Sequence, residues 1–197
     1  MRKLIVTNIM SLDGYYEGPG GDVMALPMDH RFDAYNAERL GAAGSLLLGR
    51  RTYELFKGFW PQMADHPDAT PAQREISVLE DAIDKIVVSD TLADADTRPW
   101  RDTTRTVPRS EAQEEVAALK QQAGADILVF GSRTLWHDLL AAGLVDELHL
   151  IVGGVFLGGG TPMFGAAPAR PLTLVDVHRW DDSPNALLRY ASGGDGS

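Results

Sequence analysis

The chain has 197 residues, of which 44% are hydrophobic and 23% are charged, proportions typical of one globular domain with a substantial core. Its formal net charge of −10 argues against general binding of nucleic acids or anionic membranes, because both require broad positive surface. The chain contains no cysteine, which excludes disulfide bonds, thiolate catalysis and iron–sulfur ligation.

In the first half of the chain, predicted strands alternate with predicted helices. Short hydrophobic runs predict strands over residues 2–12, 45–49 and 85–89. Helical patterns predict helices over residues 29–40, 50–58 and 72–80. Glycine and proline mark the segments between them, so we expect a turn at residues 11–14 and loops at 15–27, 60–71 and 90–103.

The second half continues this alternation and then changes to paired strands. Strands are predicted over residues 104–107, 126–131 and 146–152, and a helix over 132–142. Ser110 and Gln113 predict a capping box that opens a further helix ending near Gly124. We also expect a mobile glycine loop at 153–160, a closing antiparallel pair at 171–178 and 186–191, and a flexible tail at 192–197. The predicted class is therefore α/β, with one domain over residues 1–191 and a mixed sheet.

Two segments share one design, in which a buried apolar strand is followed by glycine and then by an Arg/Ser/Thr cluster that opens a helix. They are Leu46-Leu47-Leu48-Gly49-Arg50-Arg51-Thr52-Tyr53, the first junction, and Ile127-Leu128-Val129-Phe130-Gly131-Ser132-Arg133-Thr134-Leu135-Trp136, the second junction. A helix start offers unpaired backbone N–H groups and the positive end of a dipole, and glycine allows close approach to a phosphate. Each junction alone is also explained as a helix start with solvated arginines. Two of them favour a ligand with several phosphates, such as a dinucleotide.

The common dinucleotide and nucleotide motifs are absent. Neither the G-x-G-x-x-G fingerprint nor the Walker A pattern occurs. Gly158-Gly159-Gly160 does not match, because Met163 stands where the fingerprint needs glycine and no lysine follows. This run is equally well a plain loop, so a dinucleotide would need a different cradle.

Six short motifs then follow one another in a specific order. They are Met10-Ser11-Leu12-Asp13-Gly14, Leu48-Gly49-Arg50-Arg51-Thr52-Tyr53, Val87-Val88-Ser89, Val129-Phe130-Gly131-Ser132-Arg133-Thr134-Leu135, Asp146-Glu147-Leu148-His149-Leu150 and Leu157-Gly158-Gly159-Gly160-Thr161-Pro162-Met163-Phe164. Together they resemble the dihydrofolate reductase superfamily over residues 2 to about 190. The resemblance is strongest to its branch related to the reductase domain of the bifunctional riboflavin-biosynthesis enzyme. It implies a dihydrofolate reductase-like α/β fold, with a central mixed, mostly parallel sheet flanked by helices and NADPH bound across the strand ends.

The resemblance also implies cofactor-binding residues. In the first junction, Gly49, Arg50, Arg51 and Thr52 would hold the pyrophosphate and the 2′-phosphate side, which favours NADPH over NADH because arginine suits the extra phosphate. In the second junction, the pyrophosphate would contact Gly131, Ser132, Arg133, Thr134 and Leu135. Ser89 would lie near the adenosine, although a simple strand-ending turn explains it equally well.

On the substrate side, the resemblance points to two acids. Leu26-Pro27-Met28-Asp29 resembles the segment in which folate reductases carry their acid, so Asp29 would orient a polar substrate and relay a proton. The alternative for Asp29 is a helix N-cap. Asp13 belongs to a turn that lies beside the site in the riboflavin branch, and its alternative is a tight turn before Gly14. Trp60 and Tyr15 would wall a flat ring or belong to the core.

Two departures limit the analogy. Ile151 stands where folate reductases carry a threonine that helps to bind the pterin, and the zinc deaminase usually fused to the riboflavin reductase is missing. The histidines form no H-x-E or HExxH pattern, so no metal is expected.

We therefore expect an NADPH-dependent oxidoreductase that reduces a C=N or C=O bond of a small substrate. The nearest analogy is 5-amino-6-(5-phosphoribosylamino)uracil of riboflavin biosynthesis, with dihydrofolate second. The alternatives are a nucleotide-binding or regulatory protein that keeps the cradle without catalysis, and a purely structural dimeric domain.

The expected partners are a small-molecule substrate and a second copy of the chain. The riboflavin branch is typically dimeric, and apolar surface near residues 150–164 would serve such an interface. No apolar run approaches the roughly 18 residues of a membrane span, and the N-terminus lacks the hydrophobic stretch of a secretion signal, so we expect a cytoplasmic protein.

Overall fold

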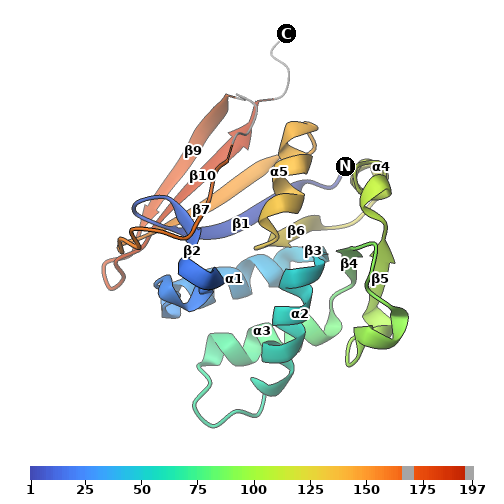
Figure 1. Cartoon of the computed structure of the whole chain (residues 1–197), viewed down its shortest axis with the longest axis horizontal. Helices are drawn as coiled ribbons and strands as arrows, with labels where there is room; N and C mark the ends of the chain where they lie inside the picture. The colour runs from blue at the N-terminus through green and yellow to red at the C-terminus, as the bar shows by residue number, and fades with distance from the viewer. Residues whose placement is uncertain (166–170, 194–197) are drawn as a thin grey trace.

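The computed structural model describes residues 1–165 and 171–193, apart from the side chains of residues 94 and 95. An eight-stranded sheet has the order β5-β4-β3-β6-β1-β7-β10-β9, and a short two-stranded sheet pairs β2 with β8 (Figure 1). The strands are β1 (Leu4–Ser11), β2 (Tyr15–Glu17), β3 (Ala43–Gly49), β4 (Lys85–Val88), β5 (Thr104–Val107), β6 (Asp126–Phe130), β7 (Glu147–Gly153), β8 (Thr161–Pro162), β9 (Leu172–Arg179) and β10 (Ala186–Ser192).

The helices follow the same alternation. The α-helices are α1 (His30–Ala42), α2 (Arg50–Phe59), α3 (Pro71–Ala82), α4 (Ala112–Gln121) and α5 (Arg133–Ala141). Short 3₁₀ helices are η1 (Pro19–Gly21), η2 (Val23–Ala25), η3 (Trp60–Gln62), η4 (Asp94–Thr97), η5 (Arg101–Thr103) and η6 (Arg109–Glu111). Within the described ranges, none of the helices is long and apolar enough to cross a membrane.

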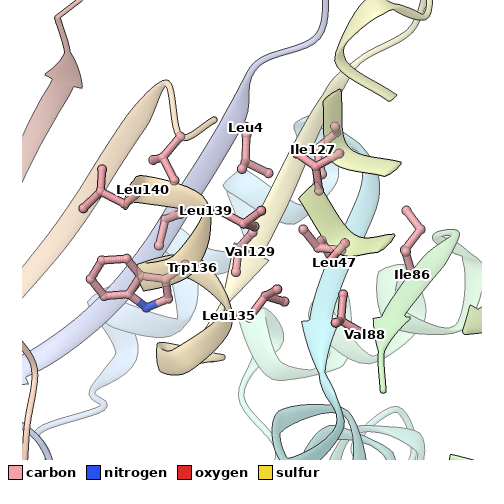
Figure 2. Close-up of a cluster of buried hydrophobic side chains, with 14 of the residues drawn as sticks. Leu4, Leu47, Ile86, Val88, Ile127, Val129, Leu135, Trp136, Leu139 and Leu140 are labelled. Carbon is pink, nitrogen blue, oxygen red and sulfur yellow. The ribbon is translucent and has the colours of Figure 1, made fainter. Parts of the chain in front are cut away.

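The central strands are buried on both faces, so their side chains divide between two cores. Alternate residues of β1, β3 and β6 pack against α4 and α5 on one face, in the cluster that Figure 2 shows around Trp136 and Leu139. The intervening residues pack against α1, α2 and α3 on the other face. The strands from β5 to β7 pair in parallel, while β10 pairs antiparallel with both β7 and β9. The predicted mixed, mostly parallel sheet flanked by helices is confirmed.

Three local predictions are wrong. Residues 15–17 form β2 rather than loop, because they pair with β8 from near the other end of the chain. Ser110 does not cap α4, because it lies within the turn η6 that precedes this helix. Glu111 occupies the N-cap position of α4, but its side chain makes no capping hydrogen bond. The capping box belongs instead to Thr70 and Gln73, at the start of α3. The predicted tail begins too early, since Ser192 ends β10, and residues 194–197 lie outside the described residues.

The pairing of β3 with β6 brings the two junctions side by side. Leu46 pairs with Leu128, so Gly49 and Gly131, each three residues further on, reach the same level of the sheet. After β6 the chain turns into α5 through Gly131 and Ser132, which have φ of 53° and 49°. Ser132 is the one non-glycine residue with positive φ in the part of the chain that the structure describes. A side chain at Gly131 would place its Cβ 3.0 Å from the Tyr16 hydroxyl and 3.1 Å from Thr52.

We predict that Gly131→Ala lowers the free energy of unfolding by about 1–3 kcal/mol, because alanine disfavours positive φ and its Cβ would press on Thr52. The matched control is Gly58→Ala in α2, where nothing lies within 4 Å of the added Cβ. That change should stabilise the protein by about 0.5–1 kcal/mol. Urea unfolding of the two variants measures both effects, and equal stabilities would contradict the prediction.

Helix α1 buries an unusual face against the sheet and α3. Its buried stripe consists of Asp33, Asn36, Ala37 and Leu40, so two of its four members are polar where an inward stripe is normally apolar. Burial raises the pKa of Asp33 to about 6, against the opposing effect of a hydrogen bond from Gln73 Nε2 at 3.0 Å. Nearby Asp29 adds to the increase, and His30 opposes it.

A carboxyl group whose pKa is raised on folding stabilises the folded state only while it is protonated. Between pH 3.8, its ordinary pKa, and about 6, the folded state holds the proton more tightly, so stability falls as the pH rises through this window. We predict that Asp33→Asn stabilises the protein at pH 7.5 by up to roughly 3 kcal/mol, and that this gain shrinks toward pH 4. Urea unfolding of wild type and variant across this range measures it.

Asp29→Asn is the control for this experiment. The pKa of Asp29 is lowered rather than raised, so this variant is expected to lose stability at neutral pH instead of gaining it. A gain for Asp29→Asn, or none for Asp33→Asn, would contradict the assignment of the buried carboxyl to Asp33.

Candidate functional site

A cavity of about 310 Å³ lies at the carboxyl ends of β3 and β6. Both junctions line it, through Gly49, Arg50, Arg51 and Thr52 and through Ser132, Arg133, Thr134 and Leu135. The remaining wall comes from β2, β8, the end of β4, the start of α4 and one face of α5. The carboxyl end of a parallel sheet is where α/β proteins commonly bind ligands, so the predicted phosphate-binding segments meet in a suitable place.

Two reciprocal hydrogen bonds join the junctions. The Gly49 N–H donates to Ser132 Oγ at 2.9 Å, and the Ser132 N–H donates to Thr52 Oγ1 at 2.9 Å. The left-handed conformation of Ser132 directs its backbone N–H and its hydroxyl toward the first junction. The two helix starts are therefore held in one fixed geometry, which is a requirement for a preorganised site.

Three helix N-termini line the cavity, and none of them has a side-chain cap. Helices α2, α4 and α5 begin there without a capping hydrogen bond. By contrast, α1 and α3 begin elsewhere and are capped, by Asp29 and Thr70. Uncapped N–H groups and the positive dipole ends of three helices favour an anion in this cavity.

Four arginines and two acids line the same cavity, so its charge is positive although the chain is acidic overall. Arg50 donates to Glu54 Oε1 at 2.7 Å and to the hydroxyl of Thr91. Arg109 approaches Asp90 at 3.7 Å. These two arginines therefore both contact the loop that follows β4, Arg50 at residue 91 and Arg109 at residue 90.

Arg51 takes a different direction. It forms an ion pair at 2.9 Å with Glu17, whose side chain is only 6% exposed. Thr161 Oγ1 also donates to Glu17, at 2.7 Å, so this carboxylate joins β2, β8 and α2 around the cavity. Arg133 is oriented by its own bond, from Nε to the Met163 carbonyl at 3.0 Å.

Ser89 lies near the cavity without lining it. Its hydroxyl accepts hydrogen bonds from the backbone N–H groups of Thr91 and Leu92, at 3.1 Å and 3.0 Å. It therefore shapes the loop between Arg50 and Arg109, and a contact with adenosine stays a prediction.

The two acids assigned to the substrate side have structural partners. Asp13 accepts hydrogen bonds from the Ser11 hydroxyl and from the N–H groups of Leu157 and Gly158. These bonds, that from Ser11 first, lower the pKa of Asp13 to about 2. Asp13 thus fastens the glycine loop 153–160 to the end of β1.

Asp29 is the N-cap of α1 and accepts from the N–H groups of Arg31 and Phe32, both at 3.0 Å. Ser183 donates a further bond to it. Burial acts to raise the pKa of Asp29, but the bond from Ser183 and the two backbone bonds outweigh it and leave the pKa lowered. Neither Asp29 nor Asp13 lines the cavity, and their catalytic roles stay predictions.

Several cavity residues escape sequence analysis. They are Tyr16, Glu17, Arg109, Gln113, Asp138 and Thr161. Tyr16, Glu17 and Thr161 reach the site only through the pairing of β2 with β8, for which the sequence carries no local signal. Arg109 comes two residues after the end of β5, much as the arginines of the first junction follow β3, and this position after a strand is the one signal that points to it.

Comparison with known proteins places this architecture in a family. The family model described as the RibD C-terminal domain matches residues 2–188. The uncharacterized protein YyaP of Bacillus subtilis (strain 168) is 31% identical over 163 residues, which cover 83% of this chain and 80% of YyaP.

Two solved structures show the same fold at low sequence identity. A putative riboflavin biosynthesis protein from Shewanella sp. PV-4 superposes with a TM-score of 0.71 at 19% identity, over 98% of this chain and 99% of that one. A diaminohydroxyphosphoribosylaminopyrimidine deaminase/5-amino-6-(5-phosphoribosylamino)uracil reductase from Thermotoga maritima gives a TM-score of 0.66 at 13% identity, over 98% of this chain and 57% of that one.

The family match spans both junctions and nearly the whole eight-stranded sheet, and it confirms the resemblance that the six motifs indicate. This chain belongs to the family of the RibD C-terminal domain.

Proposed function

We propose that this protein is an NADPH-dependent reductase that transfers hydride to a C=N or C=O bond of a small substrate. The observation that carries the proposal is the cavity itself, where three uncapped helix N-termini lie among four arginines. A ligand with several phosphates fits this combination, because each phosphate requires donors and positive charge. The family supports reductase chemistry in particular.

The two junctions would bind the pyrophosphate. The Ser132 hydroxyl and the Thr52 hydroxyl are fixed by their bonds across the junctions, and the starts of α2 and α5 supply backbone N–H groups. Gly131 adds room, because any side chain there would meet Thr52 and Tyr16. When bound, NADPH supplies the hydride, while the chain's own residues hold the cofactor and position the substrate.

Arg50 and Arg109 would select the 2′-phosphate. They contact the loop after β4 at Thr91 and Asp90, and Gln113, at the start of α4, lines the same cavity. Arg51 is less suited to this role, because a phosphate that took it would leave the buried carboxylate of Glu17 unpaired. The acid partners of Arg50 and Arg109, which are Glu54 and Asp90, are exposed to water and can be released at little cost. The preference for NADPH is thus assigned to Arg50 and Arg109 rather than to the adjacent pair Arg50 and Arg51.

The nearest substrate analogy is 5-amino-6-(5-phosphoribosylamino)uracil, which the name of the Thermotoga maritima relative contains. Dihydrofolate is second. Ile151 is fully buried in β7, so no polar side chain is offered at the position where folate reductases carry threonine.

We predict that Arg109→Ala and Arg50→Ala each weaken NADPH binding by about tenfold or more and leave NADH binding nearly unchanged. Each substitution removes a charge-assisted contact worth about 1.5–3 kcal/mol, and only NADPH carries the phosphate concerned. Quenching of tryptophan fluorescence on titration with each nucleotide measures both affinities.

Arg179→Ala is the control for this titration, because Arg179 lies on β9 in an exposed pair with Asp181, away from the cavity. It should bind both nucleotides as the wild type does. Absence of binding to either nucleotide in the wild type would overturn the proposed function, and equal loss of NADH affinity would overturn the role of the two arginines.

A nucleotide-binding protein without catalysis is the second candidate, because Asp13 and Asp29 are both occupied by structural hydrogen bonds. Tight NADPH binding with no oxidation of NADPH across a panel of carbonyl and imine substrates would favour it over the reductase.

We also propose that two copies of the chain associate through the end of the sheet. Strand β9 is one of the two edges of the sheet, and with β10 it extends beyond the helices (Figure 1). Its Leu174, Val175 and Val177 are 49%, 52% and 57% exposed, an unusual apolar surface for an edge strand. A second copy supplies a matching apolar surface by symmetry. Phe156 and Phe164 are also exposed, within the predicted 150–164 region.

We predict a solution mass of twice 21.4 kDa for the wild type and a large shift toward the monomer for Val177→Glu, because a buried unpaired carboxylate opposes association. Light scattering measures both masses. Val78→Glu is the matched control, since Val78 is similarly exposed on α3 and should stay in the wild-type state. A monomeric wild type would contradict the proposal.

A further inference from the structure

A second cavity lies at the opposite end of the sheet from the two junctions. Its volume is about 440 Å³, and it is lined by the starts of β3, β4 and β5, by the end of α4 and by residue 2, which precedes β1. Strand β4 and helix α4 each run between the cavities, since Ile86 and Leu119 line the second, and Val88 and Gln113 line the first. Among the described residues the two cavities share none, so a ligand here would not overlap the proposed cofactor.

The floor of the second cavity contains a buried cation. Arg2 is only 7% exposed, and this burial lowers its pKa, while the charges of Asp126 and Asp84 act in the opposite direction. Within the described ranges, neither these two acids nor any other carboxylate forms an ion pair with Arg2. Buried charged side chains normally have such a partner, so the counter-charge is missing here.

The hydrogen bonds of Arg2 fix its guanidinium group but leave donors unused. Nε donates to the Ala125 carbonyl and Nη2 donates to Ser45 Oγ, both at 2.6 Å. These bonds use two of the five N–H donors of the group. Because Ser45 Oγ accepts from Arg2, the Ser45 O–H can itself donate to a ligand. Positive charge and unused donors together match a carboxylate.

The two other cations that line this cavity already have partners. The Nζ of Lys85 donates to backbone carbonyls at the end of α3 and lies 4.4 Å from the centre of the Trp100 ring. Arg105 forms an ion pair with Glu115 of α4. Arg2 is therefore the cation that a ligand in this cavity would meet.

The exposed rim of the cavity is acidic. Asp84 and Asp102 both lie there, and in the part of the chain that the structure describes neither carboxylate forms an ion pair or a hydrogen bond. Their charge repels a ligand with several negative charges and attracts an amino group. The second cavity thus differs in chemistry from the first, which combines four arginines with three uncapped helix starts.

We propose that the second cavity binds a small zwitterion, a molecule with one carboxylate and one amino group. The carboxylate would bind Arg2 and the Ser45 hydroxyl, and the amino group would lie toward the two acids of the rim. Between them, the apolar side chains of Ile86 and Leu119 would contact a short hydrocarbon chain. Such a ligand supplies the counter-charge that buried Arg2 lacks. The inference does not rest on the proposed reductase function.

Three compounds with the same four-carbon chain and different charges test this inference, namely 4-aminobutyrate, butyrate and butylamine. We expect saturable binding of 4-aminobutyrate in ligand-observed NMR and at least tenfold weaker binding of the other two. Arg2→Met removes the charge but keeps an unbranched side chain, and should weaken 4-aminobutyrate at least tenfold. The double variant Asp84→Asn/Asp102→Asn should reduce the affinity for 4-aminobutyrate to that for butyrate. Both of its substitutions are on the surface, so it tests the site even where Arg2→Met does not fold.

Arg179→Met is the matched control, because it removes an exposed arginine of β9 in the same way. It should bind 4-aminobutyrate as the wild type does, and so should Arg109→Ala, whose substitution lies in the first cavity. Absence of saturable binding, tighter binding of butyrate or inorganic phosphate, an unchanged affinity in Arg2→Met or in the double variant, or a loss confined to Arg109→Ala would overturn the inference. Failure to bind NADPH, with 4-aminobutyrate binding retained, would instead overturn the proposed function alone.

Discussion

The site depends on the parallel pairing of β3 with β6, two strands that are far apart in the sequence. Their register brings Gly49 and Gly131 to one level, and the bonds between Gly49, Ser132 and Thr52 then lock the two helix starts together. A slip of one residue would turn every side chain of one strand to the opposite face and separate these groups. Both strands are apolar on both faces, so the fit of their individual side chains in the two cores, rather than alternation, opposes such a slip. Packing thus maintains the geometry of a polar site.

Around this pairing, the protein gives up stability where a ligand would bind. The three helices that start at the cavity lack side-chain caps, each of which is typically worth about 1 kcal/mol, while the capped helices start elsewhere. Asp33 and Asn36 replace apolar residues in the buried stripe of α1. These features, the missing caps and the buried polar side chains, lower the stability of the fold. They are concentrated near one end of the sheet, as is expected at a binding site.

Local patterns were sufficient for most elements, because hydrophobic alternation and helix breakers are short-range signals. They do not predict features that depend on strand pairing between distant segments or on the exact residue at which a helix begins. The pairing of β2 with β8 joins distant segments. The capping pattern at Ser110 forms no box, because the turn η6 displaces Ser110 from the start of α4, whereas the pattern at Thr70 does form one. The two junctions could be identified from sequence, but their contact could not, because strand order follows from the packing of the whole chain.

The two acids of α1 show the same limit at a finer scale. Asp29 and Asp33 are four residues apart, so either one could face the sheet until the first residue of the helix is known. The helix begins at His30, which makes Asp29 a cap and directs Asp33 inward. A shift of a few residues in a helix boundary, the least certain quantity in sequence analysis, thus changes which carboxyl group is buried.

The ion pair between Arg51 and Glu17 means that the protein carries its own competitor for any anion at that arginine. A phosphate that binds Arg51 displaces Glu17 and leaves its buried carboxylate without a partner. The free energy gained on binding is therefore the attraction of the phosphate minus the attraction of Glu17 that is lost. Added salt screens both attractions together, and the contribution of Arg51 to anion binding should therefore vary little with ionic strength. An internal counter-ion of this kind keeps an arginine in place while limiting how tightly the cavity retains phosphate-bearing ligands in general.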